Sequence, residues 1–406
     1  MKKFPRIFLL GLSVILLILA LFSIVIDPYA AFLTPRIEGV NKYKLTALKY
    51  MRLVKPYHVD YLDYEVLVTG SSRAGRGVDC RYFLARGERC YNSALTGGGI
   101  YEAYRFLQQR PGQLEHAIVS LDFFVFLREE YASEAFVENR LWRAADGTPN
   151  TSHIQQALND LFGLMFSRQT LVSSRSTWNI QDAPYINHRA DGMLYLDDWG
   201  GWSFDPSTLD ASKRNLRVNR QVSRYGNILD TMVAYYDTYT QDMATTGDNI
   251  RRQLEVYRNV LKLLYQHELQ ASLVLPPSHV SYWMIIRNQG LYPRFEQWKR
   301  NLVRINEEVA SGFSRAPLPV FDFSGANTVA MSSPPQKNQP ATFNEVFSDA
   351  MHFSRPVGDL MLDRALGACE NSRGELFGYC ITSDNIDGLL QRQDSLFRAY
   401  EEDNKD

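Results

Sequence analysis

Short apolar runs that alternate with longer amphipathic segments constrain the fold of this chain more than any other feature. Each run is of strand length and ends in a polar or glycine-rich loop. Strands that alternate with helices in this way are typical of a parallel sheet covered by helices, so the sequence predicts an α/β fold. The predicted strands are 65–69, 90–92, 117–121, 271–275 and 320–323, and the predicted helices are 100–109, 249–268, 296–309 and 355–366.

The N-terminus combines three basic residues with twenty uncharged, mostly apolar residues from Ile7 to Ile26. That length spans the core of a bilayer and exceeds the usual apolar core of a signal peptide. We predict a cytoplasmic segment 1–6, a transmembrane anchor 7–26 and export of the remaining chain, because basic residues stay on the cytoplasmic side. The alternative is a cleaved signal peptide, which also places the bulk of the protein outside the cytoplasm.

Composition and motifs exclude several classes of function. The formal net charge is −1 over 406 residues, whereas nucleic-acid binders usually carry a basic patch, so no nucleic-acid partner is expected. The sequence has no HExxH metal motif, no GxGxxG motif and no phosphate-binding glycine loop with its lysine. We therefore expect neither a metal nor a cofactor.

The four cysteines form two locally spaced pairs, Cys80 with Cys90 and Cys369 with Cys380. In an oxidising compartment each pair is expected to form a disulfide that closes a short loop. The alternative is four buried free thiols, since reduced cysteine is often a small core residue. Zinc binding is disfavoured because neither spacing is CxxC.

Two short strings far apart in the chain carry the candidate chemistry. Ser72 follows the first strand in Gly70-Ser71-Ser72, and Asp349 precedes His352 by three residues. A serine at the start of a helix lies where backbone N–H groups point at an anion, and an Asp/His pair can take its proton. Each string also has an ordinary explanation, a turn for the first and a surface ion pair for the second.

Together the motifs resemble the SGNH (GDSL-like) hydrolase superfamily, and more narrowly its membrane-anchored bacterial members related to D-alanylation and polysaccharide O-acetylation proteins. The resemblance covers about residues 60–125 and 270–366. It implies a flavodoxin-like three-layer α/β/α core with a parallel sheet. The expected segments are a linker with an approach helix (27–60), core halves (61–127 and 249–368), a mainly helical or irregular capping insertion (128–248) and a tail (369–406).

The resemblance also implies roles for single residues. Ser72 matches the nucleophile, His352 the base and Asp349 the carboxylate that orients the base. The oxyanion hole would use the backbone N–H of Ser72 and the loop that begins at Asn92, in which Ala94 replaces a glycine of the family pattern. A backbone N–H survives that replacement if the conformation tolerates a Cβ atom.

Two further residues have open interpretations. Asp122 stands where the family has an asparagine donor, and a carboxylate donates only when protonated. It could be protonated by burial, bind a substrate hydroxyl or pair with Arg73. His279 ends a predicted strand at the same edge of the sheet, where it either contacts substrate or is a hydrogen-bonded structural residue.

The expected function is that of an exported serine acyl-esterase or O-acyltransferase on a single-pass anchor in the bacterial inner membrane, with most of the chain in the periplasm. The resemblance implies a cell-envelope polysaccharide or other glycopolymer as substrate. One alternative is a non-catalytic partner with the same fold, which binds glycan or a membrane O-acyltransferase. Another is a peptidase or thioesterase that uses the same three residues.

Overall fold

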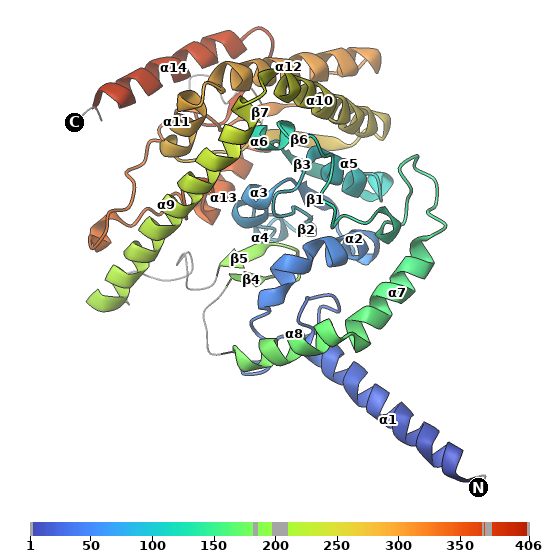
Figure 1. Ribbon diagram of the computed structural model, residues 1–406. Helices are drawn as coiled ribbons and strands as arrows, with labels where there is room; N and C mark the ends of the chain where they lie inside the picture. Colours follow the sequence, from blue (N-terminus) through green and yellow to red (C-terminus); the bar gives the residue numbers. More distant parts are fainter. Residues whose placement is uncertain (1–2, 182–185, 197–209, 368, 370–375, 404–406) are drawn as a thin grey trace. The chain divides into compact units, whose positions relative to one another are not determined.

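The computed structural model describes residues 3–181, 186–196, 210–367, 369 and 376–403 (Figure 1). The chain divides into two compact units, which are described separately. The anchor unit comprises Met1–Leu62, Glu134–Ala190 and Leu194–Trp199, and the sheet unit comprises Asp63–Ser133, Asp191–Met193 and Gly200–Asp406. The predicted insertion 128–248 is thus shared between the units rather than forming one segment.

The sheet unit is built on a six-stranded sheet in the order β2-β1-β3-β6-β7-β8. Five strands are parallel, and β8 pairs antiparallel with β7 at the edge. The predicted α/β class with a parallel sheet is confirmed. The strands are β1 (Val66–Thr69), β2 (Cys90–Asn92), β3 (His116–Ser120), β6 (Gln270–Leu275), β7 (Val320–Asp322) and β8 (Tyr379–Cys380).

The register of the parallel strands brings their C-terminal ends to one edge of the sheet. Val68 of β1 pairs with Asn92 of β2, and the last residue of β1, Thr69, pairs with Val119 of β3. Ser120 in turn pairs with Val274 of β6. The loops that follow these strands therefore meet at this edge, which is where open α/β sheets bind ligands.

Helices cover both faces of the sheet, so the residues of its central strands are buried on both sides. On one face, Val66, Val68, Ile118 and Phe321 share a buried cluster with residues of the covering helices. The intervening residues Leu67, Val119 and Leu273 have no exposed area, as expected for central strands of a parallel sheet. The first face is covered by α3 (Ser72–Gly77), α4 (Arg81–Leu84) and α13 (Arg355–Ala365); elsewhere α10 (Met243–Gln266) packs against α5 (Ile100–Leu107) and α12 (Tyr292–Gly312).

The other helices of the sheet unit are not part of the strand and helix alternation. The longest, α9 (Ala211–Thr240), contacts α11 (Val280–Asn288) and the 3₁₀ turn η5 (Pro340–Thr342). The C-terminal tail forms a helix, α14 (Ile386–Asp403), whose apolar residues Leu389 and Phe397 are buried. The shorter elements are η2 (Pro111–Gln113) and α6 (Phe123–Phe126).

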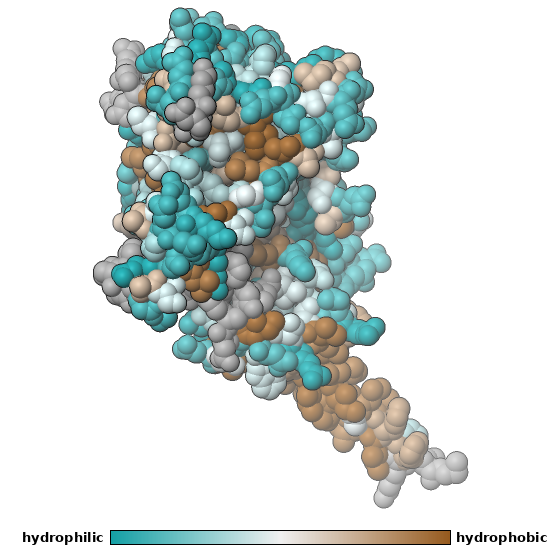
Figure 2. All heavy atoms as spheres, turned by 60° about the vertical axis from the view of Figure 1, so that its left-hand side comes forward, coloured by the Kyte–Doolittle hydropathy of each residue, from teal (hydrophilic) through white to brown (hydrophobic). Residues whose placement is uncertain are grey.

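The anchor unit begins with α1 (Lys3–Ile26), whose stretch Phe4–Ile26 is the one helix among the described residues long and apolar enough to cross a membrane. The exposed surface of α1 is apolar along most of its length (Figure 2). Only the last two turns are packed, with Ala20, Ser23 and Ile26 buried. The remaining elements are η1 (Leu45–Tyr50), α2 (Met51–Tyr61), η3 (Glu138–Arg140), α7 (His153–Phe166), α8 (Arg168–Asn179) and the antiparallel pair β4 (Ile186–His188) and β5 (Leu194–Leu196).

One sequence prediction needs adjustment in this part of the chain, and part of another falls outside the described residues. The approach helix expected within 27–60 is a 3₁₀ turn, η1, followed by α2, which extends to Tyr61. Residues 182–185 and 197–209 of the expected capping insertion 128–248 lie outside the described residues.

Candidate active site

Ser72 is the first residue of α3 and follows a sharp turn at the end of β1. The turn requires glycine, since Gly70 has φ +138° and a Cβ atom there would lie 2.7 Å from Cβ of Ser120. Ser71 caps the helix by accepting the N–H of Arg73. The strand and helix therefore place the Ser72 side chain at the C-terminal edge of the sheet, beside N–H groups of a first helical turn.

Ser72, His352 and Asp349 form a continuous chain of hydrogen bonds. Ser72 Oγ lies 2.9 Å from His352 Nε2, although 280 residues separate the two in sequence. On the other side of the ring, His352 Nδ1 lies 2.9 Å from both carboxylate oxygens of Asp349. The predicted proximity of Ser72 and His352 is therefore present in the structure.

Local turn geometry holds Asp349 in place. Its Oδ1 accepts the backbone N–H groups of Met351 and His352, each at 2.9 Å. These bonds explain the three-residue spacing seen in the sequence: the turn that the carboxylate caps also brings the imidazole back onto it. All three members of the chain are nearly buried, with 7%, 5% and 5% of Ser72, Asp349 and His352 exposed.

The protonation states suit a base that accepts a proton from Ser72. Burial lowers the pKa of His352, and the nearby Arg76 guanidinium lowers it further, against the opposing effect of Asp349. Burial by itself would raise the pKa of Asp349, but His352 and Arg76 outweigh it and hold that pKa below its ordinary range. At neutral pH the imidazole is therefore neutral, with Nδ1–H donated to the carboxylate and Nε2 facing the serine.

Arginines lie near Asp349, the carboxylate end of the chain of hydrogen bonds. Arg76 Nη1 lies 3.7 Å from Asp349 Oδ2. Burial lowers the pKa of Arg224 of α9, which interacts electrostatically with Asp349 and Arg76, and with Arg217 and Arg220 of its own helix. The spacing of three and four residues places these three arginines of α9 on one helix face. Sequence reasoning passed over this group because it lies in the predicted insertion, although the spacing itself was readable.

Helix α9 also holds the loop that leads into Asp349. Gln221 donates to the carbonyls of Asn344 and Phe347, both at 2.8 Å, and accepts the N–H of Asn344 at 2.9 Å. A single amide side chain with no exposed area thus satisfies three backbone groups. The placement of the base depends on a helix that none of the predicted motifs contains.

Arg73 and Asp122 form a buried ion pair. Arg73 Nη1 lies 2.6 Å from Asp122 Oδ1, and its Nη2 donates to Pro276 O and Ser278 Oγ, both at 2.7 Å. The pair joins α3 to the ends of β3 and β6. Of the three interpretations of Asp122, the structure supports pairing with Arg73. An oxyanion donor role does not fit, because Oδ1 of this carboxylate accepts a charge-assisted hydrogen bond from the Arg73 guanidinium.

Asn92 and Ala94 tie the second loop to the first. Asn92 Nδ2 donates to Ala74 O and Val78 O at 3.1 and 2.9 Å. Its Oδ1 accepts the N–H of Ala94 at 3.1 Å. The expected use of the Ala94 N–H as an oxyanion donor does not fit this arrangement, since the group already donates within its own loop.

His279 is a structural residue. It has no exposed area, and burial lowers its pKa to about 4. Its Nδ1 accepts the N–H of Ser281 as the cap of α11, and its Nε2 lies 2.8 Å from Ser332 O. Its backbone N–H donates to Ala350 O at 3.0 Å. The substrate-contact interpretation is not supported, and His279 instead helps to position the Asp349–His352 turn.

Both predicted disulfides are present. Cys80 is bonded to Cys90 with Cα atoms 5.2 Å apart, and Cys369 to Cys380 with Cα atoms 5.3 Å apart. The first joins the start of α4 to β2, and the second fastens the edge strand β8. Such bonds persist in oxidising, extracytoplasmic compartments. Among the described residues, no group of three His, Cys, Asp or Glu side chains could hold a metal ion.

No protein-family model matches this chain, and no curated protein matches it. The assignment of a function therefore rests on the sequence motifs and on the geometry of the site.

Proposed function

We propose that this protein is an extracytoplasmic serine acyl-esterase or O-acyltransferase of the SGNH type, held at the bacterial inner membrane by α1. The observation that carries the proposal is the chain of 2.9 Å contacts from Ser72 through His352 to Asp349. A serine nucleophile, a base and an orienting carboxylate are the components of covalent acyl transfer.

The fold and the disulfides support the same proposal. Counted in chain order, the five parallel strands lie in the order 2-1-3-4-5, which is the flavodoxin-like order. In such sheets ligands bind at the C-terminal edge of the strands, where Ser72 lies. The apolar helix α1 and the two disulfides support a single anchor with the remaining chain in an oxidising compartment.

The reaction follows from the roles of the three residues. Ser72 Oγ attacks the carbonyl carbon of an acyl ester while its proton passes to His352 Nε2. The tetrahedral intermediate collapses, the C–O bond to the donor alcohol breaks, and His352 returns the proton to that alcohol. Water or a sugar hydroxyl then attacks the acyl-serine by the same route and releases free acid or an acylated glycan. Water access during this second half decides between hydrolysis and transfer.

The charge around the site bears on the acceptor. Arg76 and Arg224 place positive groups beside the Asp349–His352 pair, and Arg217 and Arg220 extend this charge along α9. We infer a cell-envelope glycopolymer that carries carboxylate or phosphate groups, because such groups gain electrostatic attraction here.

A fluorophosphonate probe and an acyl-ester assay test the proposal together. Full-length protein in detergent should hydrolyse p-nitrophenyl acetate and carry the probe on Ser72, and Ser72→Ala should lose both properties. Ser71→Ala is the matched control, since the Ser71 side chain accepts the N–H of Arg73, whereas Ser72 is the serine that contacts His352. Equal turnover by the wild type and Ser72→Ala would remove the catalytic assignment.

A second candidate is a non-catalytic partner that binds glycan or a membrane O-acyltransferase. It is favoured by one observation, that Asp122 and the Ala94 N–H are both engaged in structural bonds. Under this alternative the probe does not react with Ser72, while the protein is still retained by the polymer or co-purifies with the acyltransferase.

A further inference from the structure

An apolar surface lies next to α1 in the anchor unit. Ile154, Leu158 and Phe162 of α7 are 64%, 62% and 65% exposed, and Leu161 is 39% exposed. Their spacing of three, four and seven residues places them on one stripe of the helix. Soluble surfaces rarely expose a contiguous stripe of this kind unless it binds something. We call these four side chains the α7 stripe.

The helices α7 and α8 pack against the last turns of α1. Ser23 Oγ donates to Met165 O at 3.0 Å, and the rings of Phe22 and Trp178 lie 5.8 Å apart. Figure 1 shows α7 and α8 spreading to either side of this end of α1. The stripe therefore lies beside the point where α1 enters the packed part of the unit.

The length of α1 places this point at a membrane boundary. A hydrocarbon core about 30 Å thick takes about 20 helical residues at about 1.5 Å each. Counted from Phe4, where the apolar span begins, the outer boundary falls close to Ser23. The contacts of α7 and α8 with α1 are thus at the level of the outer headgroups.

The polar and aromatic residues of α8 suit that level. Trp178 is 53% exposed, and tryptophan is enriched where bilayers meet water. Arg168 and Arg175 are exposed on either side of Val172 in the sequence, at spacings of four and three residues that share one helix face. Arginines at such a surface are attracted to anionic lipid headgroups.

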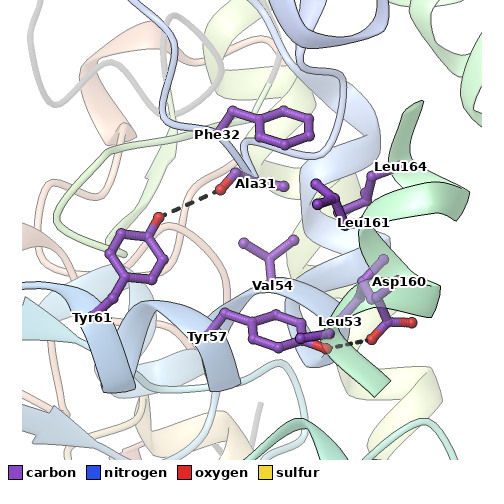
Figure 3. Close-up of a pocket in the computed structure, with 10 residues that line it drawn as sticks. Ala31, Phe32, Leu53, Val54, Tyr57, Tyr61, Asp160, Leu161 and Leu164 are labelled. Atoms are coloured by element: carbon purple, nitrogen blue, oxygen red, sulfur yellow. Dashed lines mark hydrogen bonds between the residues drawn. The ribbon is translucent and has the colours of Figure 1, made fainter. Parts of the chain in front are cut away.

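A pocket opens behind the stripe. It has a volume of about 260 Å³ and is lined mainly by apolar side chains, including Phe32, Leu53, Val54, Leu161 and Leu164 (Figure 3). Leu161 belongs to both the stripe and the pocket wall. A dry apolar cavity of about 150 Å³ already binds benzene, so this one has room for the end of an acyl chain. The polar groups at its wall are engaged, with Tyr57 donating to Asp160 at 2.7 Å.

We propose that the α7 stripe and α8 form a lipid-binding surface that lies in the outer leaflet of the membrane spanned by α1, with one lipid acyl chain entering the pocket. The proposal rests on the proposed anchor. Continuity with α1 favours lipid over a protein partner, because a helix packed on the end of a transmembrane segment meets the bilayer before any other ligand.

Site-specific fluorescence quenching tests the surface. All four cysteines are in disulfides, so one introduced cysteine can be labelled selectively. An environment-sensitive fluorescent label is attached to full-length Phe162→Cys and, separately, to full-length Asn159→Cys. Each labelled protein is reconstituted in phosphatidylcholine/phosphatidylglycerol vesicles whose lipids carry a nitroxide quencher at carbon 5 of the acyl chains. Asn159 is the matched control, since it is exposed on the polar side of the same helix. We expect at least threefold stronger quenching at position 162 than at position 159.

Photocrosslinking tests the pocket in the same vesicles. A phosphatidylcholine with a diazirine near the end of one acyl chain should label α2 at Leu53 or Val54, as well as α7. Ala157→Phe, which fills the pocket from its α7 wall, should lower the α2 labelling at least threefold and leave the labelling of the exposed α7 residues Ile154 and Leu158 unchanged. Lipid adducts on α1 alone would overturn the pocket assignment, whatever the folding of the variant.

The outcomes separate this inference from the anchor on which it rests. Extraction of the wild-type protein by alkaline carbonate would refute the anchor itself. The lipid-facing surface would be refuted if the protein stays in the membrane while the labels at positions 162 and 159 are quenched equally by the nitroxide and are equally accessible to aqueous iodide. Protection of position 162 only after addition of a membrane protein would likewise overturn the proposal and assign the stripe to a protein partner.

Discussion

Replacing Asp349 with asparagine tests how the base is held, because the structure dictates how the new amide must lie. In the native site, Oδ1 accepts two backbone N–H groups at 2.9 Å. These groups will hold the amide oxygen in the same place, so the NH₂ group takes the place of Oδ2. That position lies 2.9 Å from His352 Nδ1, and a protonated Nδ1 would face a donor there.

Two losses follow from Asp349→Asn. The first is the charge that stabilises the imidazolium: unit charges about 4 Å apart at an effective dielectric of about 20 interact by about 4 kcal/mol, or about 10³-fold in rate. The second is the tautomer, since an NH₂ donor favours a proton on Nε2, which then cannot accept the proton of Ser72. An imidazole held in the wrong tautomer lowers the turnover of a Ser-His-Asp triad about 10⁴-fold. We expect a loss of kcat of about 10³-fold to 10⁴-fold.

The assay is initial-rate hydrolysis of p-nitrophenyl acetate by full-length protein, with circular dichroism to confirm folding. Asp387→Asn is the control, because that side chain is 78% exposed on α14 and forms only a surface ion pair with Arg300. It should retain the wild-type rate. A folded Asp349→Asn variant that keeps more than a tenth of the wild-type kcat would refute the role assigned to Asp349.

Three further predictions concern the base, the buried ion pair and a disulfide. Since burial and Arg76 lower the pKa of His352 from its ordinary 6.5, kcat/KM should be constant near pH 7 and fall with acid at a midpoint below 6.5; a pH profile with a midpoint above 7 would contradict this. Arg73→Ala should lower the free energy of unfolding in urea by about 3–5 kcal/mol, because it leaves Asp122 buried without its partner. Arg86→Ala, which breaks an exposed pair with Asp363, should cost at most about 1 kcal/mol, and equal losses would argue against a buried pair. Replacing both Cys80 and Cys90 with serine opens a loop of sequence separation 10 and should cost about 3 kcal/mol by loop entropy; an unchanged urea midpoint would refute that contribution.

Predictions that depended on local sequence were largely confirmed. The strands predicted at 65–69 and 271–275, the pairing of neighbouring cysteines and the Asp349–His352 turn each involve residues close in the chain. Hydrophobic runs, short loops and capping turns are determined within such windows, so their patterns are readable without a structure.

Predictions that assigned partners across the sheet fared less well. Asp122 had three possible roles, and only the meeting of β3, β6 and α3 selected the pairing with Arg73. The backbone N–H of Ala94 was expected to contribute to the oxyanion hole, but it donates to Asn92 Oδ1 within its own loop. The direction of one N–H depends on the path of a whole loop, which a motif does not specify.

The amino-acid sequence by itself determined three features of this protein. They are an apolar segment long enough to span a membrane, an alternation of strands and helices, and the candidate site residues Ser72, Asp349 and His352. The tertiary structure alone decided that β1 and the turn at 349–352 meet with Ser72 Oγ 2.9 Å from His352 Nε2. It also decided that α9 carries arginines beside that turn, and that α7 lies exposed at the end of α1. The physical reason is that hydrophobic periodicity specifies which face of an element is buried, whereas the partner that buries it is chosen by packing among elements distant in the chain.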